Sequence, residues 1–211
     1  MKNINVTGVR SLALGLVLVA LFAAAQGAAR ADEVTVAGTT GGSFNNTSNN
    51  NLGGLTYNSA FFNATTLNGF VILQNPPNPA LNFNNLGSLT LSGPAANYNG
   101  NMLMLRVQFN APSGIVGSNV ITLVGNISSI AGGGVFIDFN NTPLTFSFAD
   151  STGSGQFAFS VADVTVPLGG TVAIVSTITV PSQVPEPATI TLLGTGLAAA
   201  VRLVRRRRNS V

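Results

Sequence analysis

Three aspartates, Asp138, Asp150 and Asp163, are the residues in the middle of this 211-residue chain that could support acid–base chemistry. A pair of carboxylates in one cleft can hydrolyse a glycosidic bond. Their spacings of 12 and 13 residues are typical of successive strands or loops, and nothing in the spacing requires them to meet. The chain has no His or Cys, and its single Lys is Lys2, so the usual nucleophiles and bases are missing. We therefore predict no catalytic residues and no enzyme activity, unless the three carboxylates share a pocket.

The same acidic segments offer oxygen atoms to a cation. Residues 138–141 (Asp-Phe-Asn-Asn) and 150–153 (Asp-Ser-Thr-Gly) combine carboxylate, amide and hydroxyl groups near predicted turns. Calcium takes such oxygens, but neither segment has the spacing of an EF-hand loop. Asp and Asn side chains also bond their own backbone in tight turns. We predict turns here, with no metal and no cofactor.

Two further residue types could contact a ligand. Tyr57, Tyr98 and the Phe residues could stack on a sugar ring. Phe at alternating positions is typical of a core, so an exposed tyrosine is the candidate for carbohydrate binding. Arg106 is the only cation between residues 31 and 185, where five acidic residues give a net charge of −4. Nucleic-acid binding requires cations that neutralise phosphates, so this region is not expected to bind nucleic acid. Arg106 is predicted to face solvent.

The elements that must position these residues are short β-strands. Apolar residues alternate with polar ones most clearly at 102–109, where Leu103, Leu105, Val107 and Phe109 share one face. Similar runs recur at intervals of about 8–12 residues, separated by Gly, Asn and Pro. They lie at residues 34–36, 70–73, 86–91, 121–127, 135–139, 144–148, 157–161, 163–166 and 172–180. We predict an all-β domain at residues 32–180, an antiparallel β-sandwich (jelly-roll-like) of about eight to ten strands.

Turn signals and low-complexity sequence separate these runs. Asn68-Gly69 predicts a type I′ turn, because both residues tolerate positive φ, and Asn99-Gly100 predicts a second turn. The segment at residues 39–51 consists almost entirely of Gly, Asn, Ser and Thr. Such a composition buries little apolar surface, so it predicts a long mobile loop.

The last residues of the chain combine three signals. Residues 181–187 are a Pro-rich linker containing Pro185, Glu186 and Pro187, and proline favours extended backbone. Residues 188–204 are apolar, and as a helix of 17 residues they would be about 25 Å long, near the short limit for crossing a bilayer. Residues 205–211 form a basic tail. The cations of this region, Arg202, Arg205, Arg206, Arg207 and Arg208, predict a membrane stop with its basic end in the cytoplasm.

This arrangement resembles the PEP-CTERM sorting tail of exported bacterial proteins. The resemblance covers about the last 27 residues and rests on Pro185-Glu186-Pro187, the apolar segment after it and Arg205–Arg208. Arg202, within the apolar segment, departs from the usual pattern and leaves the end of the helix open. The resemblance implies recognition and cleavage near Pro185–Pro187 by a membrane-embedded exosortase, followed by release to the cell envelope. Such proteins occur in Gram-negative bacteria that make exopolysaccharide.

The N-terminus predicts a secretory signal peptide at residues 1–31. Lys2 and Arg10 form a basic start, and residues 11–25 are almost continuously apolar. Ala29 and Ala31 flank Arg30 in a small-x-small pattern, which places the cut after Ala31. With no Cys, the exported domain is expected to depend on packing and hydrogen bonds alone.

Three functions follow, in decreasing order of support. The first is a structural, non-enzymatic protein of the cell envelope or extracellular matrix, sorted through its tail. Its partners would be the export machinery, an exosortase, transiently the inner membrane, and exopolysaccharide. The second is a surface carbohydrate-binding or adhesin-like module that uses its loops or the Asn-rich segment. The third is a secreted hydrolase that uses the aspartates.

Overall fold

The computed structural model describes residues 33–78, 80–93, 97–150, 153–181 and Gly196. By contact density the chain divides into residues 31–182 and a second unit made of residues 1–30 and 183–211. The first unit contains fifteen β-strands and one 3-10 turn, Ala131–Gly133, within its described residues. The predicted all-β class is confirmed.

The largest sheet, here called the large sheet, has seven strands. Its order across the sheet is β13 (Val164–Val166), β10 (Val135–Phe139), β9 (Val120–Ser129), β8 (Asn101–Ala111), β1 (Thr35–Phe44), β4 (Ala60–Thr65) and β6 (Asn82–Phe83). Neighbouring strands are antiparallel except for β4 and β6, which are parallel. The two longest pairings, β8 with β1 and β8 with β9, lie at its centre.

Two four-stranded sheets form the other side of the domain. The β12 sheet has the order β11 (Leu144–Asp150), β12 (Gly153–Val161), β15 (Ser176–Thr179) and β5 (Phe70–Leu73). The β7 sheet has the order β14 (Thr171–Ala173), β7 (Ser88–Leu91), β3 (Leu55–Asn58) and β2 (Asn51–Leu52). Residues 172–180, which the alternation predicted as one strand, are divided between them, because β14 pairs with β7 and β15 pairs with β12 and β5.

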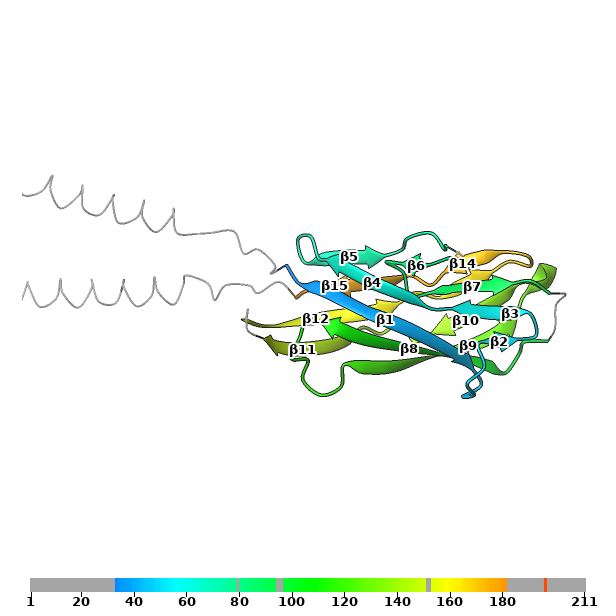
Figure 1. The fold of residues 1–211 in the computed structure, drawn as a ribbon, viewed down its shortest axis with the longest axis horizontal. Coiled ribbons are helices and arrows are strands. Elements are labelled where there is room, and N and C mark those ends of the chain that lie inside the picture. The colour runs from blue at the N-terminus through cyan, green and yellow to red at the C-terminus, as the bar shows by residue number, and fades with distance from the viewer. Residues whose placement is uncertain (1–32, 79, 94–96, 151–152, 182–195, 197–211) are drawn as a thin grey trace, which may run out of the picture. The chain divides into compact units, whose positions relative to one another are not determined.

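A single apolar core joins the three sheets. Figure 1 shows the large sheet lying over the two smaller ones. Inward side chains from all three sheets form one buried cluster, which includes Leu105 of β8, Phe157 of β12 and Leu89 of β7. Phe109 is at the centre of a group of rings, with centroids 5.0–5.8 Å from those of Phe62, Phe146, Phe157 and Phe159. Burial of this apolar surface is the main source of stability in a chain without disulfides.

Strand β8 follows the predicted alternation. Its inward residues, Leu103, Leu105, Val107 and Phe109, are at most 1% exposed. Arg106 lies on the opposite face and is exposed, as predicted. The period of two therefore assigned both faces of the strand correctly.

The Gly/Asn segment was predicted wrongly. Residues 39–44 are not a loop but belong to β1, a central strand of the large sheet. Gly42 faces the core, and a Cβ there would lie 2.5–2.7 Å from ring atoms of Tyr57. The glycine thus lets an aromatic ring pack directly on the strand backbone, a recognised role of Gly in strands. The ring of Tyr57, from the β7 sheet, fills the space that a side chain at position 42 would occupy.

The asparagines that follow β1 form a bonded turn. The Asn45 side chain receives a bond from Met102 N (2.9 Å) and donates one to Asn101 Oδ1 (2.7 Å). Asn50 Nδ2 donates to Tyr57 O (3.2 Å), and Thr47 Oγ1 donates to Phe44 O (2.7 Å). These hydrogen bonds connect the segment to β8 and β3, so its polar residues stabilise the fold.

The turn predictions are confirmed. Asn68 (φ 54°) and Gly69 (φ 77°) both have positive φ, as a type I′ turn requires, and Leu67 and Phe70 bond each other across it. At the second turn Gly100 alone has positive φ (79°), and Asn101 N donates to Tyr98 O. The described strands fall within residues 32–180, while the jelly-roll arrangement and the exact domain limits stay predictions.

Candidate functional site

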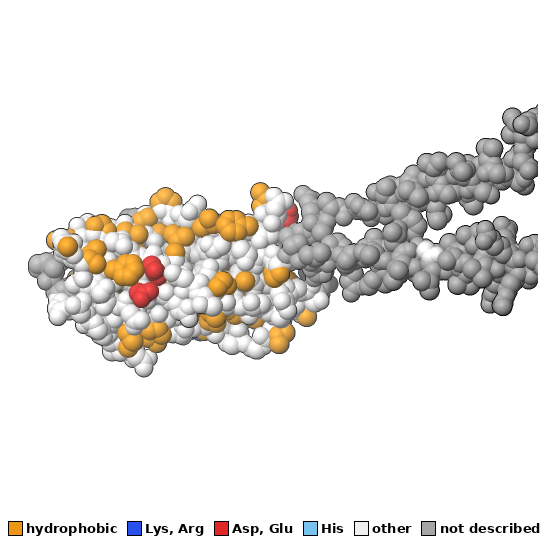
Figure 2. Space-filling view, turned by 180° about the vertical axis from the view of Figure 1, so that it is seen from behind, with side chains coloured by type: hydrophobic (Ala, Val, Ile, Leu, Met, Phe, Trp, Pro, Cys, Tyr) orange, Lys and Arg blue, Asp and Glu red, His pale blue; other side chains and the backbone are white. Residues whose placement is uncertain are grey.

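The structure brings two of the three aspartates together. The pairing of β10 with β13 ends at Ile137 and Val164, so Asp138 and Asp163 occupy the next pair of positions, and both are exposed. Figure 2 shows a group of acidic side chains toward the left of this face and a further acidic side chain at the right-hand end of the domain. Asp150 ends β11, in the β12 sheet. Among the described residues, no group of three or more His, Cys, Asp or Glu could hold a metal ion.

Asp163 has a structural task. Its Oδ1 accepts a bond from Phe139 N (3.0 Å). With its amide nitrogen turned toward three acceptors, Asn141 donates to Asp163 Oδ1 (3.1 Å), Phe139 O (3.0 Å) and Val161 O (2.8 Å). Asn140 Oδ1 accepts from Thr142 N (3.0 Å), which is the predicted Asx turn. The carboxylate therefore fixes the turn between β10 and β11.

Neither tyrosine is available to stack on a sugar ring, so the condition for sugar binding by an exposed tyrosine is not met. Tyr57 and Tyr98 are 2% and 1% exposed. The Tyr57 hydroxyl lies 2.7 Å from Thr40 Oγ1 and 2.9 Å from Leu86 O, and Tyr98 donates to Gly53 O (2.6 Å). Burial raises the pKa of Tyr57 well above its ordinary value, partly offset by the bond to Thr40, and burial also raises the pKa of Tyr98.

The exposed aromatic residues among those described are phenylalanines, and the sequence pattern did not single out which ones would be exposed. Phe61 of β4 and Phe83 of β6 are register partners, and their ring centroids are 4.7 Å apart. Each is 37% exposed. Asn84 beside them accepts a bond from Asn63 N (2.8 Å) and donates its own N–H to Phe61 O (3.0 Å). The parallel pairing with the two-residue strand β6, which alternation alone does not reveal, brings the two rings together.

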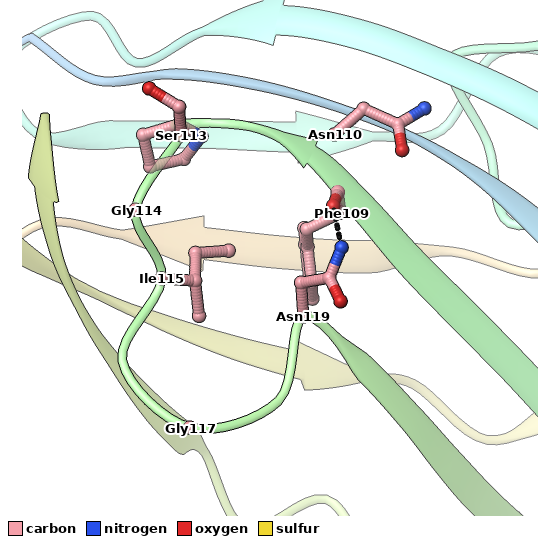
Figure 3. A pocket seen from close by; sticks show the side chains of 8 residues that line it. Phe109, Asn110, Ser113, Gly114, Ile115, Gly117 and Asn119 are labelled. Atoms are coloured by element: carbon pink, nitrogen blue, oxygen red, sulfur yellow. Dashed lines mark hydrogen bonds between the residues drawn. The ribbon is translucent and has the colours of Figure 1, made fainter.

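A shallow pocket of about 340 Å³ lies within the loop that joins β8 to β9. Its lining is uncharged: Phe109, Asn110, Pro112, Ser113, Gly114, Ile115, Gly117 and Asn119. Figure 3 shows Ile115 and Asn119 turned toward the enclosed space, with Asn119 Nδ2 donating to Phe109 O (3.0 Å). The loop also bonds the edge strand β11, through Val116 N to Ser147 O (2.8 Å) and Ala149 N to Gly114 O (3.0 Å). With no ionisable side chain, this pocket offers no acid or base.

The residues predicted for sorting and export lie outside the described residues. They are Ala29, Ala31, Pro185, Glu186, Pro187, Arg202, Arg205, Arg206, Arg207 and Arg208. The predicted spans at residues 1–31 and 188–204 also lie outside them, apart from Gly196. Among the residues that are described, no helix has the length and apolar character needed to cross a membrane.

Comparison with protein families identifies the tail. Residues 183–208 match the PEP-CTERM protein-sorting motif. Neither curated proteins nor solved structures give a match to the chain. The motif marks an extracellular protein that an exosortase processes at the membrane. It implies a membrane-anchored precursor and a mature product in the cell envelope or outside the cell.

Proposed function

We propose that residues 32–180 form a structural, non-enzymatic domain of the cell envelope or extracellular matrix, delivered by its sorting tail. In this proposal the signal peptide is removed after Ala31, and residues 188–204 hold the precursor in the inner membrane. Arg202 and Arg205–Arg208 keep the basic end in the cytoplasm, in accordance with the positive-inside rule. Processing near Pro185–Pro187 then frees the domain.

The proposal is supported by two features seen together: one apolar core that joins the three sheets, and a surface pocket whose lining carries no charge. The core joins all three sheets. The loop pocket is lined without any acidic or basic residue. Asp163 is engaged by the turn that it fixes, and Asp150 lies in another sheet. Such a domain can stay folded outside the cell without a bound cofactor or a catalytic site. We propose that exopolysaccharide surrounds it there.

The sorting role is tested by replacing Pro185, Glu186 and Pro187 with alanine in the native host. Export depends on the N-terminal signal, so the precursor should still reach the membrane. Tail removal should stop, and the full-length form should accumulate, as seen by immunoblot and intact mass. The matched control Pro181→Ala/Ser182→Ala lies just before the matched residues and should be processed normally. Unchanged processing of the triple variant would reject the assignment of the motif.

Carbohydrate binding is the second candidate, and Phe61 with Phe83 favours it. Paired exposed rings present apolar faces that can stack on sugar rings, and nearby amides can bond hydroxyls. The processed protein is applied to immobilised host polysaccharide, and Phe61→Ala/Phe83→Ala should lower retention at least tenfold. Phe70→Ala is the control, because Phe70 is 46% exposed on a different sheet. Equal retention of all three proteins would exclude the ring pair as a sugar site.

A further inference from the structure

The two ends of the described domain leave it at the same place. Thr66 N donates to Val34 O (3.0 Å), and Val34 N donates to Thr66 Oγ1 (2.9 Å). Val180 N donates to Gly69 O (2.7 Å). The turn at residues 66–70 therefore lies between the first and last strands, and Figure 1 shows β1 beginning and β15 ending on the same side.

This end of the domain carries the two most exposed large apolar side chains among the described residues. Leu67, in the turn, is 68% exposed, and Val116, in the β8–β9 loop, is 69% exposed. The loop lies at the same end, because Ala111 of β8 pairs with Ala37 near the start of β1. Phe70, across the turn from Leu67, is 46% exposed. We call Leu67, Phe70 and Val116 the apolar tip.

The apolar tip is held in place by backbone bonds. Leu67 N donates to Phe70 O (2.9 Å) and Phe70 N to Leu67 O (3.2 Å) across the type I′ turn. Val116 N is bonded to Ser147 O (2.8 Å) of β11. Their backbones are thus already ordered, so contact with a partner costs little further backbone entropy. The described cation, Arg106, lies midway along β8, and the exposed side chain next to Val34 is the acidic Glu33. Attraction of this end to a lipid surface therefore depends on apolar contact and not on a cation that binds anionic headgroups.

The number of residues between the domain and the apolar tail segment limits the distance between this end of the domain and the membrane anchor. Seven residues separate Val180 from Ala188, a span of at most about 25 Å at 3.3–3.6 Å per residue. A tether of that length holds the domain near the anchor at an effective concentration of about the millimolar range. Weak contacts become populated under these conditions.

We infer that the apolar tip rests against the lipid bilayer while the tail anchors the precursor, at the level where headgroups meet acyl chains. The inference rests on the proposed anchoring by residues 188–204. Leu67 and Val116 stand on separate loops, and a lipid surface accepts separate apolar side chains without a complementary shape. Once the tether is cut, two or three side chains are too few to hold the domain, so processing releases it.

The absence of Cys allows single cysteine probes in the full chain. A fluorophore is attached at Ser118→Cys beside Val116, at Ser48→Cys in the turn after β1, or at Ala198→Cys in the apolar tail segment. Ser48 lies beyond the far end of β1, which spans about 33 Å in ten residues. The chains are inserted into phosphatidylcholine vesicles containing lipids with a quencher near the headgroup. Quenching is expected at positions 118 and 198 and not at 48.

Substitutions in the apolar tip then test the cause. Leu67→Asn/Val116→Asn in the Ser118→Cys chain should at least halve the quenching, whereas Leu81→Asn/Leu168→Asn, at exposed apolar residues elsewhere, should leave it unchanged. Equal thermal unfolding temperatures confirm that the variants are folded.

Quenching at position 198 without quenching at position 118 would overturn the inference but would still support the membrane anchor. If the tip variants slow tail removal in the host without lipid contact, the surface belongs to the processing enzyme instead. No quenching at 198 would reject the anchor itself, and the inference with it.

Discussion

The domain at residues 33–181 and the tail at residues 183–208 depend on sequence in different ways. The tail is identified by a short motif, in which particular residue types in a fixed order carry the meaning. In the domain, the apolar side chains of the core pack against one another across three sheets, and Asp163 bonds the backbone of a turn. The recognised function of this chain therefore lies in its sorting tail, while the structural role of the domain is our proposal. Substitutions in the core of the domain should therefore change its stability and leave processing of the tail unchanged.

Of the substitutions compared below, Gly42→Ala is expected to have the largest effect on stability. The added Cβ would meet the ring of Tyr57, and overpacking of this kind costs about 1–3 kcal/mol in the free energy of unfolding. Gly41 is the matched control on the same strand, because a Cβ there has no atom within 4 Å. Gly41→Ala should change stability by less than about 1 kcal/mol. Urea unfolding of the two variants measures the difference, and equal effects would show that β1 is not packed as described.

A smaller effect is expected from Tyr57→Phe, which keeps the ring and removes the hydroxyl. Loss of the bonds to Thr40 and Leu86 should cost about 1 kcal/mol. Burial raises the pKa of Tyr57 in the folded state, so above about pH 10 the unfolded chain loses this proton first. Wild-type stability should fall as pH rises, by at most about 1.4 kcal/mol per pH unit for this group.

The same variant tests the pH dependence. Tyr57→Phe should show a shallower loss of stability between pH 10 and 11, measured by urea unfolding at each pH. Burial also raises the pKa of Tyr98, which is still present in this variant. Part of the dependence of stability on pH should therefore remain. An unchanged slope in the variant would mean that Tyr57 ionises as easily in the folded protein as in the unfolded chain.

The smallest effects concern the acidic pair. Asp163→Ala removes the acceptor for Phe139 N and should lower stability by about 1 kcal/mol. Asp138→Ala, at the exposed neighbouring position, should stay within about 0.5 kcal/mol of the wild type. Thermal unfolding of both variants separates a structural carboxylate from a surface one. The reverse order would contradict the assignment of Asp163 to the turn.

Periodicity predicted the fold class because the inward positions of β8 and its neighbours carry large apolar side chains. It failed at β1, where glycine replaces a side chain and the filling group, Tyr57, comes from another strand. It also missed β4 and β6, so the sequence pattern did not indicate that Phe61 and Phe83 would lie side by side on the surface. Contacts between distant segments decide these cases, and a local pattern contains no signal for them. The tail motif needed no such contacts, since its residues are consecutive.

In the proposed sequence of events, the tail anchors the precursor, and cleavage near Pro185–Pro187 then frees the domain. Intact-mass spectrometry of the mature protein from its native host tests this most directly. We expect a polypeptide that begins at Asp32, ends near Pro185–Pro187 and lacks Arg205–Arg208. A mature extracellular protein that retains the four arginines would contradict it.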